Sequence, residues 1–142
     1  MRGARVLDGY AGTGALGLEA LSRGAAEVVF VERDRRAETL IRRNLDRCEI
    51  ETGYGIIRGA LPAVLRRGRS LGRFDLILLD PPYDADGLNA VLAGLREHLA
   101  PDGLLVLERA TRSDVRQVRE LTKTRTVRSG DSALDFYQLS PT

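Results

Sequence analysis

Residues 5–24 read RVLDGYAGTGALGLEALSRG, and this stretch decides the fold class. The apolar run at residues 5–8 predicts a short β-strand, and residues 15–23 predict a helix that stops at Gly24. A glycine-rich turn joins the two. A strand, a glycine turn and a helix in this order open the α/β folds that bind nucleotides near the helix N-terminus.

The rest of the chain repeats the alternation of strand and helix. Strands are predicted at residues 27–31, 55–58, 74–79 and 104–108, and helices at residues 34–48, 61–67, 86–99 and 113–121. Two β-type runs, 122–128 and 133–139, flank a turn and predict a hairpin. We therefore expect an α/β fold in one domain, residues 1–142, with helices on both faces of a mostly parallel seven-stranded sheet that ends in an antiparallel hairpin.

Composition narrows the class of protein. The 142 residues are 43% hydrophobic and 30% charged, with a net charge of +2, and no apolar stretch approaches a membrane span or forms a signal peptide. Cys48 is the only cysteine and His98 the only histidine, so we expect no internal disulfide and no metal site. A cytoplasmic location is expected. The basic residues are nearly all arginines, which fit either a polyanionic partner or solvated helix faces.

The end of the fourth strand carries the sequence Asp80-Pro81-Pro82-Tyr83. Open α/β sheets bind ligands at the carboxyl ends of their strands. The Asp80 carboxylate or a backbone carbonyl beside the prolines can accept hydrogen bonds from an amine, and the prolines fix the direction of the carbonyls. The Tyr83 ring offers a stacking face worth roughly 1–3 kcal/mol per base. The alternative is an ordinary strand-end turn.

The glycine turn fits the pattern G-x-G-x-x-G at Gly12, Gly14 and Gly17. A nicotinamide dinucleotide is disfavoured, because Asp8 would repel its pyrophosphate and because the loop is longer than that fingerprint. A zwitterionic ligand with an ammonium and a carboxylate suits the turn better. Glu32, at the end of the second strand, is placed to accept hydrogen bonds from ribose hydroxyls.

Taken together, these motifs resemble those of class I S-adenosylmethionine-dependent methyltransferases that act on exocyclic amines. The blocks GALGLEALSRGA at residues 14–25, FVERD at residues 30–34 and GDSAL at residues 130–134 resemble the RsmD family, whose members methylate guanine N2 in small-subunit ribosomal RNA. The resemblance implies a Rossmann-like class I methyltransferase fold. It also implies S-adenosylmethionine as cofactor, S-adenosylhomocysteine as product, and ribosomal RNA or a small-subunit particle as partner of a monomeric enzyme.

The resemblance assigns the site residue by residue. The expected catalytic residues are Asp80, Pro81, Pro82 and Tyr83. The expected cofactor-binding residues are Asp8, Gly9, Tyr10, Ala11, Gly12, Gly14, Glu32, Arg33, Gly59, Ala60 and Asp80. Gly59-Ala60 stands where related enzymes often have an acid near the adenine, so backbone amides are expected to serve there.

The start of the chain departs from the family pattern, and several other functions remain open. Family members usually begin with a basic β-hairpin and a helix, whereas this chain begins almost on its first strand, so we expect that segment to be absent. The open alternatives are an adenine N6 or other amine methyltransferase of DNA, RNA or protein, and a non-catalytic cofactor-binding domain. A nicotinamide oxidoreductase ranks last.

Overall fold

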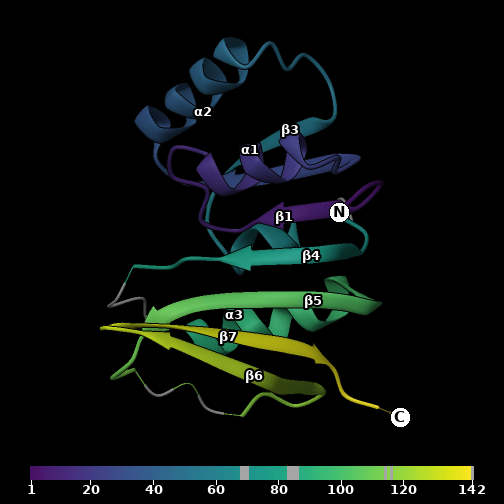
Figure 1. Ribbon diagram of the computed structural model, residues 1–142, viewed down its shortest axis with the longest axis vertical. Helices are drawn as coiled ribbons and strands as arrows, with labels where there is room; N and C mark the ends of the chain where they lie inside the picture. Colours follow the sequence, from purple (N-terminus) through teal and green to yellow (C-terminus); the bar gives the residue numbers. More distant parts are fainter. Residues whose placement is uncertain (68–70, 83–86, 114, 116, 142) are drawn as a thin grey trace.

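The computed structural model describes residues 1–142 except 68–70, 83–86, 114, 116 and 142. Its centre is a seven-stranded sheet in the order β3-β2-β1-β4-β5-β7-β6 (Figure 1). The strands are β1 (Arg5–Asp8), β2 (Glu27–Glu32), β3 (Tyr54–Arg58), β4 (Phe74–Leu79), β5 (Leu99–Ala110), β6 (Leu121–Ser129) and β7 (Ser132–Leu139). Neighbours from β3 to β5 pair in parallel, and β7 pairs antiparallel with both β5 and β6. The predicted α/β fold with a C-terminal antiparallel hairpin is therefore confirmed.

Helices cover both faces of the sheet. They are α1 (Ala15–Ser22), α2 (Arg35–Arg47), α3 (Leu88–Leu95) and the short 3₁₀ helices η1 (Ala63–Arg66) and η2 (Arg96–His98). Side chains of α1 and α2 pack with Val6, Val28 and Phe30 on one face, in front of the sheet in Figure 1. Helices α3 and η1 pack on the other face, where Leu7 points. Alternation along each strand thus sends successive residues into two separate cores.

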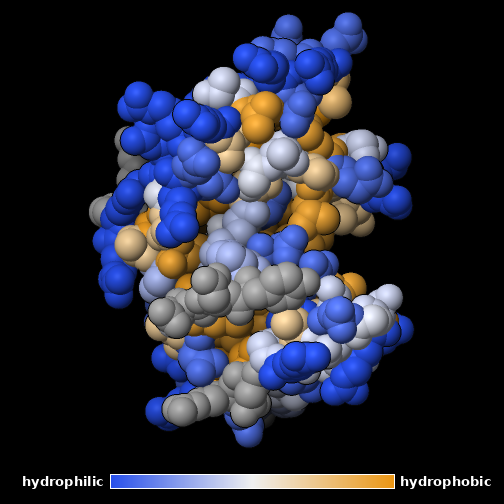
Figure 2. All heavy atoms as spheres, turned by 90° about the vertical axis from the view of Figure 1, so that its left-hand side faces the viewer, coloured by the Kyte–Doolittle hydropathy of each residue, from blue (hydrophilic) through white to orange (hydrophobic). Residues whose placement is uncertain are grey.

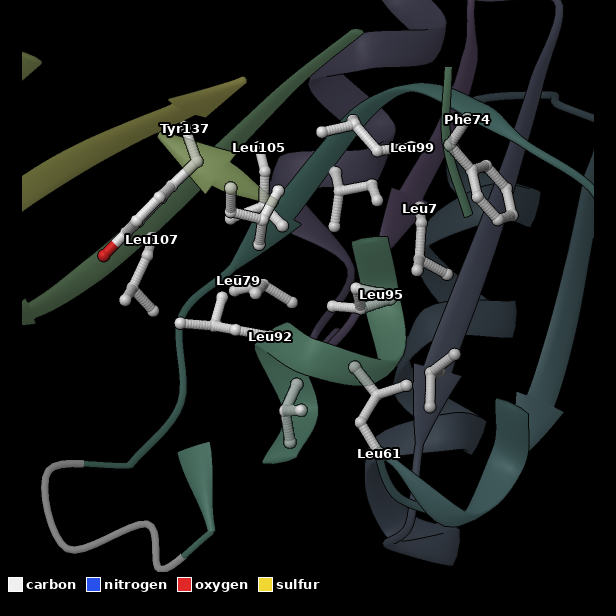
Figure 3. Packing of buried hydrophobic residues seen from close by; sticks show 14 of the residues in the cluster. Leu7, Leu61, Phe74, Leu79, Leu92, Leu95, Leu99, Leu105, Leu107 and Tyr137 are labelled. Carbon is white, nitrogen blue, oxygen red and sulfur yellow. The ribbon is translucent and has the colours of Figure 1, made fainter. Parts of the chain in front are cut away.

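The larger core lies between α3 and the strands β1, β4, β5 and β7. It contains fully buried leucines and phenylalanine from these strands and from α3, among them Leu7, Phe74, Leu92, Leu95, Leu105 and Leu107 (Figure 3). Burying such a side chain contributes about 1.5–3 kcal/mol. This core fixes β4 and β5 against each other, and β4 ends directly before the predicted acceptor motif.

The helix predicted at residues 113–121 is wrong, because the described residues of this segment are not helical. The carbonyl of Ser113, which a helix would bond to a backbone N–H four residues on, accepts a hydrogen bond from Arg109 Nη1 at 3.2 Å. At the other end, Glu120 has φ 69°, which ends any helix before β6. Val118 and Leu121 are still buried, so this segment packs against the core without forming a helix.

Smaller differences concern the ends of elements. The predicted helix at residues 61–67 is the one-turn helix η1, and the predicted helix at residues 86–99 divides into α3 and η2. Strand β5 begins at Leu99, five residues before the prediction. In the part of the chain that the structure describes, no helix combines the length and apolar character needed to cross a membrane.

Candidate active site

Four carboxylates lie at the carboxyl ends of four neighbouring strands. Glu32 ends β2, Asp8 ends β1, Asp80 follows β4, and Glu108 lies near the end of β5. The sheet order β2-β1-β4-β5 therefore sets these acids side by side. Figure 2 looks onto this edge of the molecule, where hydrophobic residues show between hydrophilic ones.

A cavity of about 850 Å³ opens at this edge. Its volume lies within the ~300–1,000 Å³ range of small-molecule sites. The lining residues come from the glycine turn and from the ends of β2, β3, β4 and β5: Gly9, Tyr10, Gly12, Val31, Glu32, Arg33, Gly59, Ala60, Leu61, Asp80, Pro81, Pro82, Glu108 and Arg109. One cavity thus joins the predicted cofactor residues to the predicted acceptor motif.

The glycine turn holds one wall of the cavity close to the sheet. The Ala11 N–H donates to the Val31 carbonyl at 3.0 Å, and the Gly14 N–H donates to the Ala11 carbonyl at 2.7 Å. Gly12 and Gly14 have φ values of 57° and 85°, a backbone region that side chains disfavour. At Gly9, an added Cβ would lie only 2.6 Å from Leu79 Cδ2. At Gly9 and Gly12 the turn therefore lines the cavity with backbone, and Tyr10 lies between them in the same lining.

Asp8 lies beneath this turn rather than in the cavity wall. Its side chain is buried, and its Oδ2 accepts a hydrogen bond from the Gly17 N–H at 3.1 Å. Burial raises the pKa of Asp8 to about 6; the Gly17 hydrogen bond opposes this rise, and the charges of Asp80 and Glu32 add to it. A positive group bound nearby would favour the ionised carboxylate.

Glu32 is anchored through both of its carboxylate oxygens. Oε1 accepts from the Gly12 N–H at 2.8 Å, and Oε2 accepts from the Asp34 N–H at 2.9 Å. A carboxylate has about four lone-pair sites, so each oxygen retains one for a further donor. The backbone thus fixes Glu32 against the cavity, in an orientation suited to accept from two adjacent hydroxyls.

The acceptor half of the cavity contains a pair of carboxyl groups. Leu79 pairs with Leu107 in the parallel register of β4 and β5, so Asp80 and Glu108 follow on neighbouring strands. Burial raises the pKa of Glu108, and the charge of Asp80 and a hydrogen bond between the two side chains raise it further. Pro81 and Pro82 line the cavity beside them. Tyr83 lies outside the described residues.

The guanidinium of Arg109, the residue after Glu108, binds the neighbouring strand β7. It makes a bidentate ion pair with the buried Asp135 of β7, and it donates to the carbonyls of Ala110, Thr111 and Ser113. Burial alone would raise the pKa of Asp135, but hydrogen bonds from Arg109 and Thr126 outweigh it and hold the pKa below its usual value. This network fixes the loop after β5 at the rim of the cavity.

The structure brings most of the predicted site residues together at the cavity. Asp8, Ala11 and Gly14 do not line it; they form the support of the glycine turn. Four lining residues were not predicted: Val31, Leu61, Glu108 and Arg109. Glu108 carries the same signal as Glu32 and Asp80, an acid at the carboxyl end of a predicted strand, and that signal could have found it.

Comparisons with known proteins agree with this geometry. Residues 1–138 match the protein family described as "Conserved hypothetical protein 95". The chain is 35% identical to the Bacillus subtilis protein YlbH over 143 residues, which cover 96% of this chain and 76% of that protein. It is also 35% identical, over 106 residues, to the ribosomal RNA small subunit methyltransferase D of Haemophilus influenzae. That match covers 72% of this chain and 54% of the relative, so the chain spans about half the length of the Haemophilus enzyme.

A solved structure shows the same fold. A conserved protein of Streptococcus pyogenes superposes with a TM-score of 0.88 at 29% identity, covering 99% of this chain and 88% of that one. The resemblance to RsmD and the Rossmann-like class I methyltransferase fold are both confirmed. The chain belongs to the family described as Conserved hypothetical protein 95, the family of RsmD-like methyltransferases.

Proposed function

We propose that this chain transfers the methyl group of S-adenosylmethionine to an exocyclic amine, N2 of a guanine in small-subunit ribosomal RNA. The observation that carries the proposal is the shared cavity, which the glycine turn and Glu32 line on one side and Asp80-Pro81-Pro82 line on the other. A methyltransferase needs donor and acceptor in contact, and this cavity offers adjoining sites for both.

The chemistry of the donor half fits the cofactor. Glu32 would accept from the ribose hydroxyls, and the Gly59-Ala60 backbone and the apolar Val31 and Leu61 would border the adenine. The backbone of Gly9, Tyr10 and Gly12, with Arg33, would contact the remaining polar groups. The buried Asp8 would act through its charge beneath the turn. When bound, the cofactor supplies a methyl group already activated on a sulfonium.

The acceptor half would position the amine. Asp80 and the Pro81 carbonyl would accept hydrogen bonds from the two amine N–H groups and turn the nitrogen lone pair toward the methyl group. The new N–C bond forms as the S–C bond breaks, and the amine then loses a proton. Acceptors fixed beside the nitrogen stabilise the positive charge that develops there. Tyr83 would stack on the base once it has left its helix.

The RNA substrate class is supported by the relatives, because the Haemophilus protein is named as a methyltransferase of small-subunit ribosomal RNA. The many arginines would pair with the phosphates of an RNA. RNA binding should therefore weaken steeply as the salt concentration rises. The proposal places the protein in the cytoplasm, because ribosomal particles assemble there. It also includes a monomeric enzyme.

The test is methyl transfer from labelled cofactor to hypomethylated small-subunit particles and to naked ribosomal RNA, followed by nucleoside analysis. Asp80→Ala should lose most of the transfer rate while keeping cofactor affinity, because Asp80 serves the acceptor. Asp46→Ala, an exposed acid on α2, is the matched control and should behave as wild type. Retention of most of the rate in Asp80→Ala would exclude its assigned role. Cofactor binding without transfer to any RNA would favour the non-catalytic alternative.

A further inference from the structure

Glu108 lies where the acceptor base must enter. The register of β4 and β5 pairs Leu79 with Leu107, so Asp80, which follows β4, and Glu108, near the end of β5, lie at the same level of the sheet. Both residues line the cavity together with Pro81 and Pro82, and their carboxyl groups are within hydrogen-bonding reach of each other. A base held by Asp80 therefore comes into contact with Glu108.

The charges of this pair determine which ligand edge it accepts. An ionised carboxylate only accepts hydrogen bonds. Two such groups side by side repel each other, and after burial the charge of Asp80 is a further cause of the raised pKa of Glu108. A ligand that presents two neighbouring N–H donors relieves the repulsion by giving one donor to each acid. A ligand that presents one donor beside a lone pair sets that lone pair against a carboxylate.

Guanine and adenine differ in this respect. Guanine carries its exocyclic N2 amine next to a ring N1–H, so its edge has adjacent donors. Adenine carries its N6 amine next to N1 with a lone pair, so its edge has a donor beside an acceptor. Both amines could reach Asp80, and the neighbouring ring atom distinguishes them.

We propose that Glu108 accepts the ring N1–H of the target guanine while Asp80 and the Pro81 carbonyl hold the exocyclic amine, and that Glu108 thereby selects guanine against adenine. This inference rests on the proposed amine methyl transfer and adds the residue that reads the base. A carboxylate left facing a lone pair loses a hydrogen bond and gains repulsion, and sites of this kind discriminate strongly.

The experiment uses RNA substrates that differ at one base, guanine or 2-aminopurine. 2-Aminopurine keeps the exocyclic 2-amine but has a lone pair at N1 in place of N1–H. Wild type should methylate the guanine RNA and strongly disfavour the 2-aminopurine RNA. Glu108→Gln is nearly isosteric, and its amide can either accept or donate. Its preference for guanine over 2-aminopurine should therefore fall by about tenfold or more, largely through faster transfer to 2-aminopurine.

Matched measurements separate the outcomes. Glu51 is an exposed acid that does not line the cavity. Glu51→Gln should therefore keep the wild-type preference. Thermal unfolding and cofactor affinity should be unchanged in both variants. A folded, active Glu108→Gln enzyme with the wild-type preference would overturn the role of Glu108 alone. Failure of wild type to methylate any guanine RNA would overturn the proposed function, and the inference with it. Equal wild-type rates on the two RNAs would overturn only the base-reading step.

Discussion

The carboxylate of Asp8 accepts a hydrogen bond from the N–H of Gly17 at 3.1 Å. Helix α1 begins after Gly14, which has no side chain to cap the first turn. Asp8 at the end of β1, nine residues before Gly17, supplies the missing acceptor. A residue of the acidic edge thus also fixes the start of the helix, which ties the cofactor side of the cavity to the stability of the fold.

Burial of Asp8 makes stability depend on its ionisation, and the hydrogen bond from Gly17 opposes this effect only in part. The pKa of Asp8 is raised from 3.8 to about 6, so the folded state binds this proton more tightly than the unfolded state does. The resulting stabilisation is complete below about pH 4 and is lost as the pH rises through about 6, a change of about 3 kcal/mol. In Asp8→Asn, which keeps an oxygen for Gly17, this loss should be absent. Urea unfolding across that window checks it, and parallel curves for the two proteins would contradict it.

The same ionisation should be coupled to cofactor binding. A bound sulfonium or ammonium favours the charged carboxylate, so wild type should release about half a proton on binding S-adenosylmethionine near pH 6. Titration calorimetry in two buffers of different ionisation enthalpy measures the release. Asp8→Asn should release less than wild type by that amount. Identical apparent enthalpies for wild type in both buffers would argue against the coupling.

Gly17 should tolerate no side chain. An added Cβ would lie 2.3 Å from Phe30 Cε1 and 2.9 Å from Val28 Cγ1, between α1 and β2. Gly17→Ala should therefore destabilise the fold by about 1–3 kcal/mol or more through overpacking. Gly55→Ala is the matched control, because a Cβ there meets nothing within 4 Å. Denaturant midpoints measure both, and equal midpoints would show that α1 shifts without cost.

The Arg109–Asp135 pair should be worth more than a surface ion pair. Both side chains are buried, with 8% and 0% exposed. Asp135→Ala removes the carboxylate opposite a buried guanidinium and should cost about 3–5 kcal/mol at neutral pH. Since the pKa of Asp135 is lowered, this contribution should be lost as the pH falls below the ordinary carboxyl range. Urea unfolding at neutral pH and at a pH below the ordinary carboxyl range tests this, with Asp46→Ala as the control.

The sequence predicted the fold because its strongest patterns are local. The glycine turn at Gly12 and Gly14 and the apolar runs of β2 and β4 specify their structure from neighbouring residues alone. Residues 113–121 show the limit of that approach. Local sequence predicts a helix there, but Arg109, bound to Asp135 across β5 and β7, donates a hydrogen bond to the Ser113 carbonyl. No local pattern reports a competitor held from a distant strand.

The candidate site divides in the same way. Glu32 and Asp80 were recognisable because each ends a strand next to a known kind of motif. Glu108 carries the same strand-end signal without a motif beside it, and its relation to Asp80 depends on the register of β4 with β5. Asp8 was expected to take part in cofactor binding, and only the folded chain shows that its carboxylate lies beneath the turn and accepts from Gly17.

The row of acids from Glu32 through Asp8 and Asp80 to Glu108 follows the hydrogen-bonded order of the strands. Neighbouring strands are spaced about 4.8 Å apart, and that spacing is set by backbone pairing and cannot widen to relieve repulsion. On the donor side, Glu32 lines the cavity and Asp8 lies beneath the glycine turn; under the proposed function, these two acids would attract a cationic methyl donor. Methyl transfer turns the sulfonium into a neutral thioether. Under the proposed function, the product would lose the attraction of these two acids, so their placement would favour exchange of the spent cofactor for fresh donor.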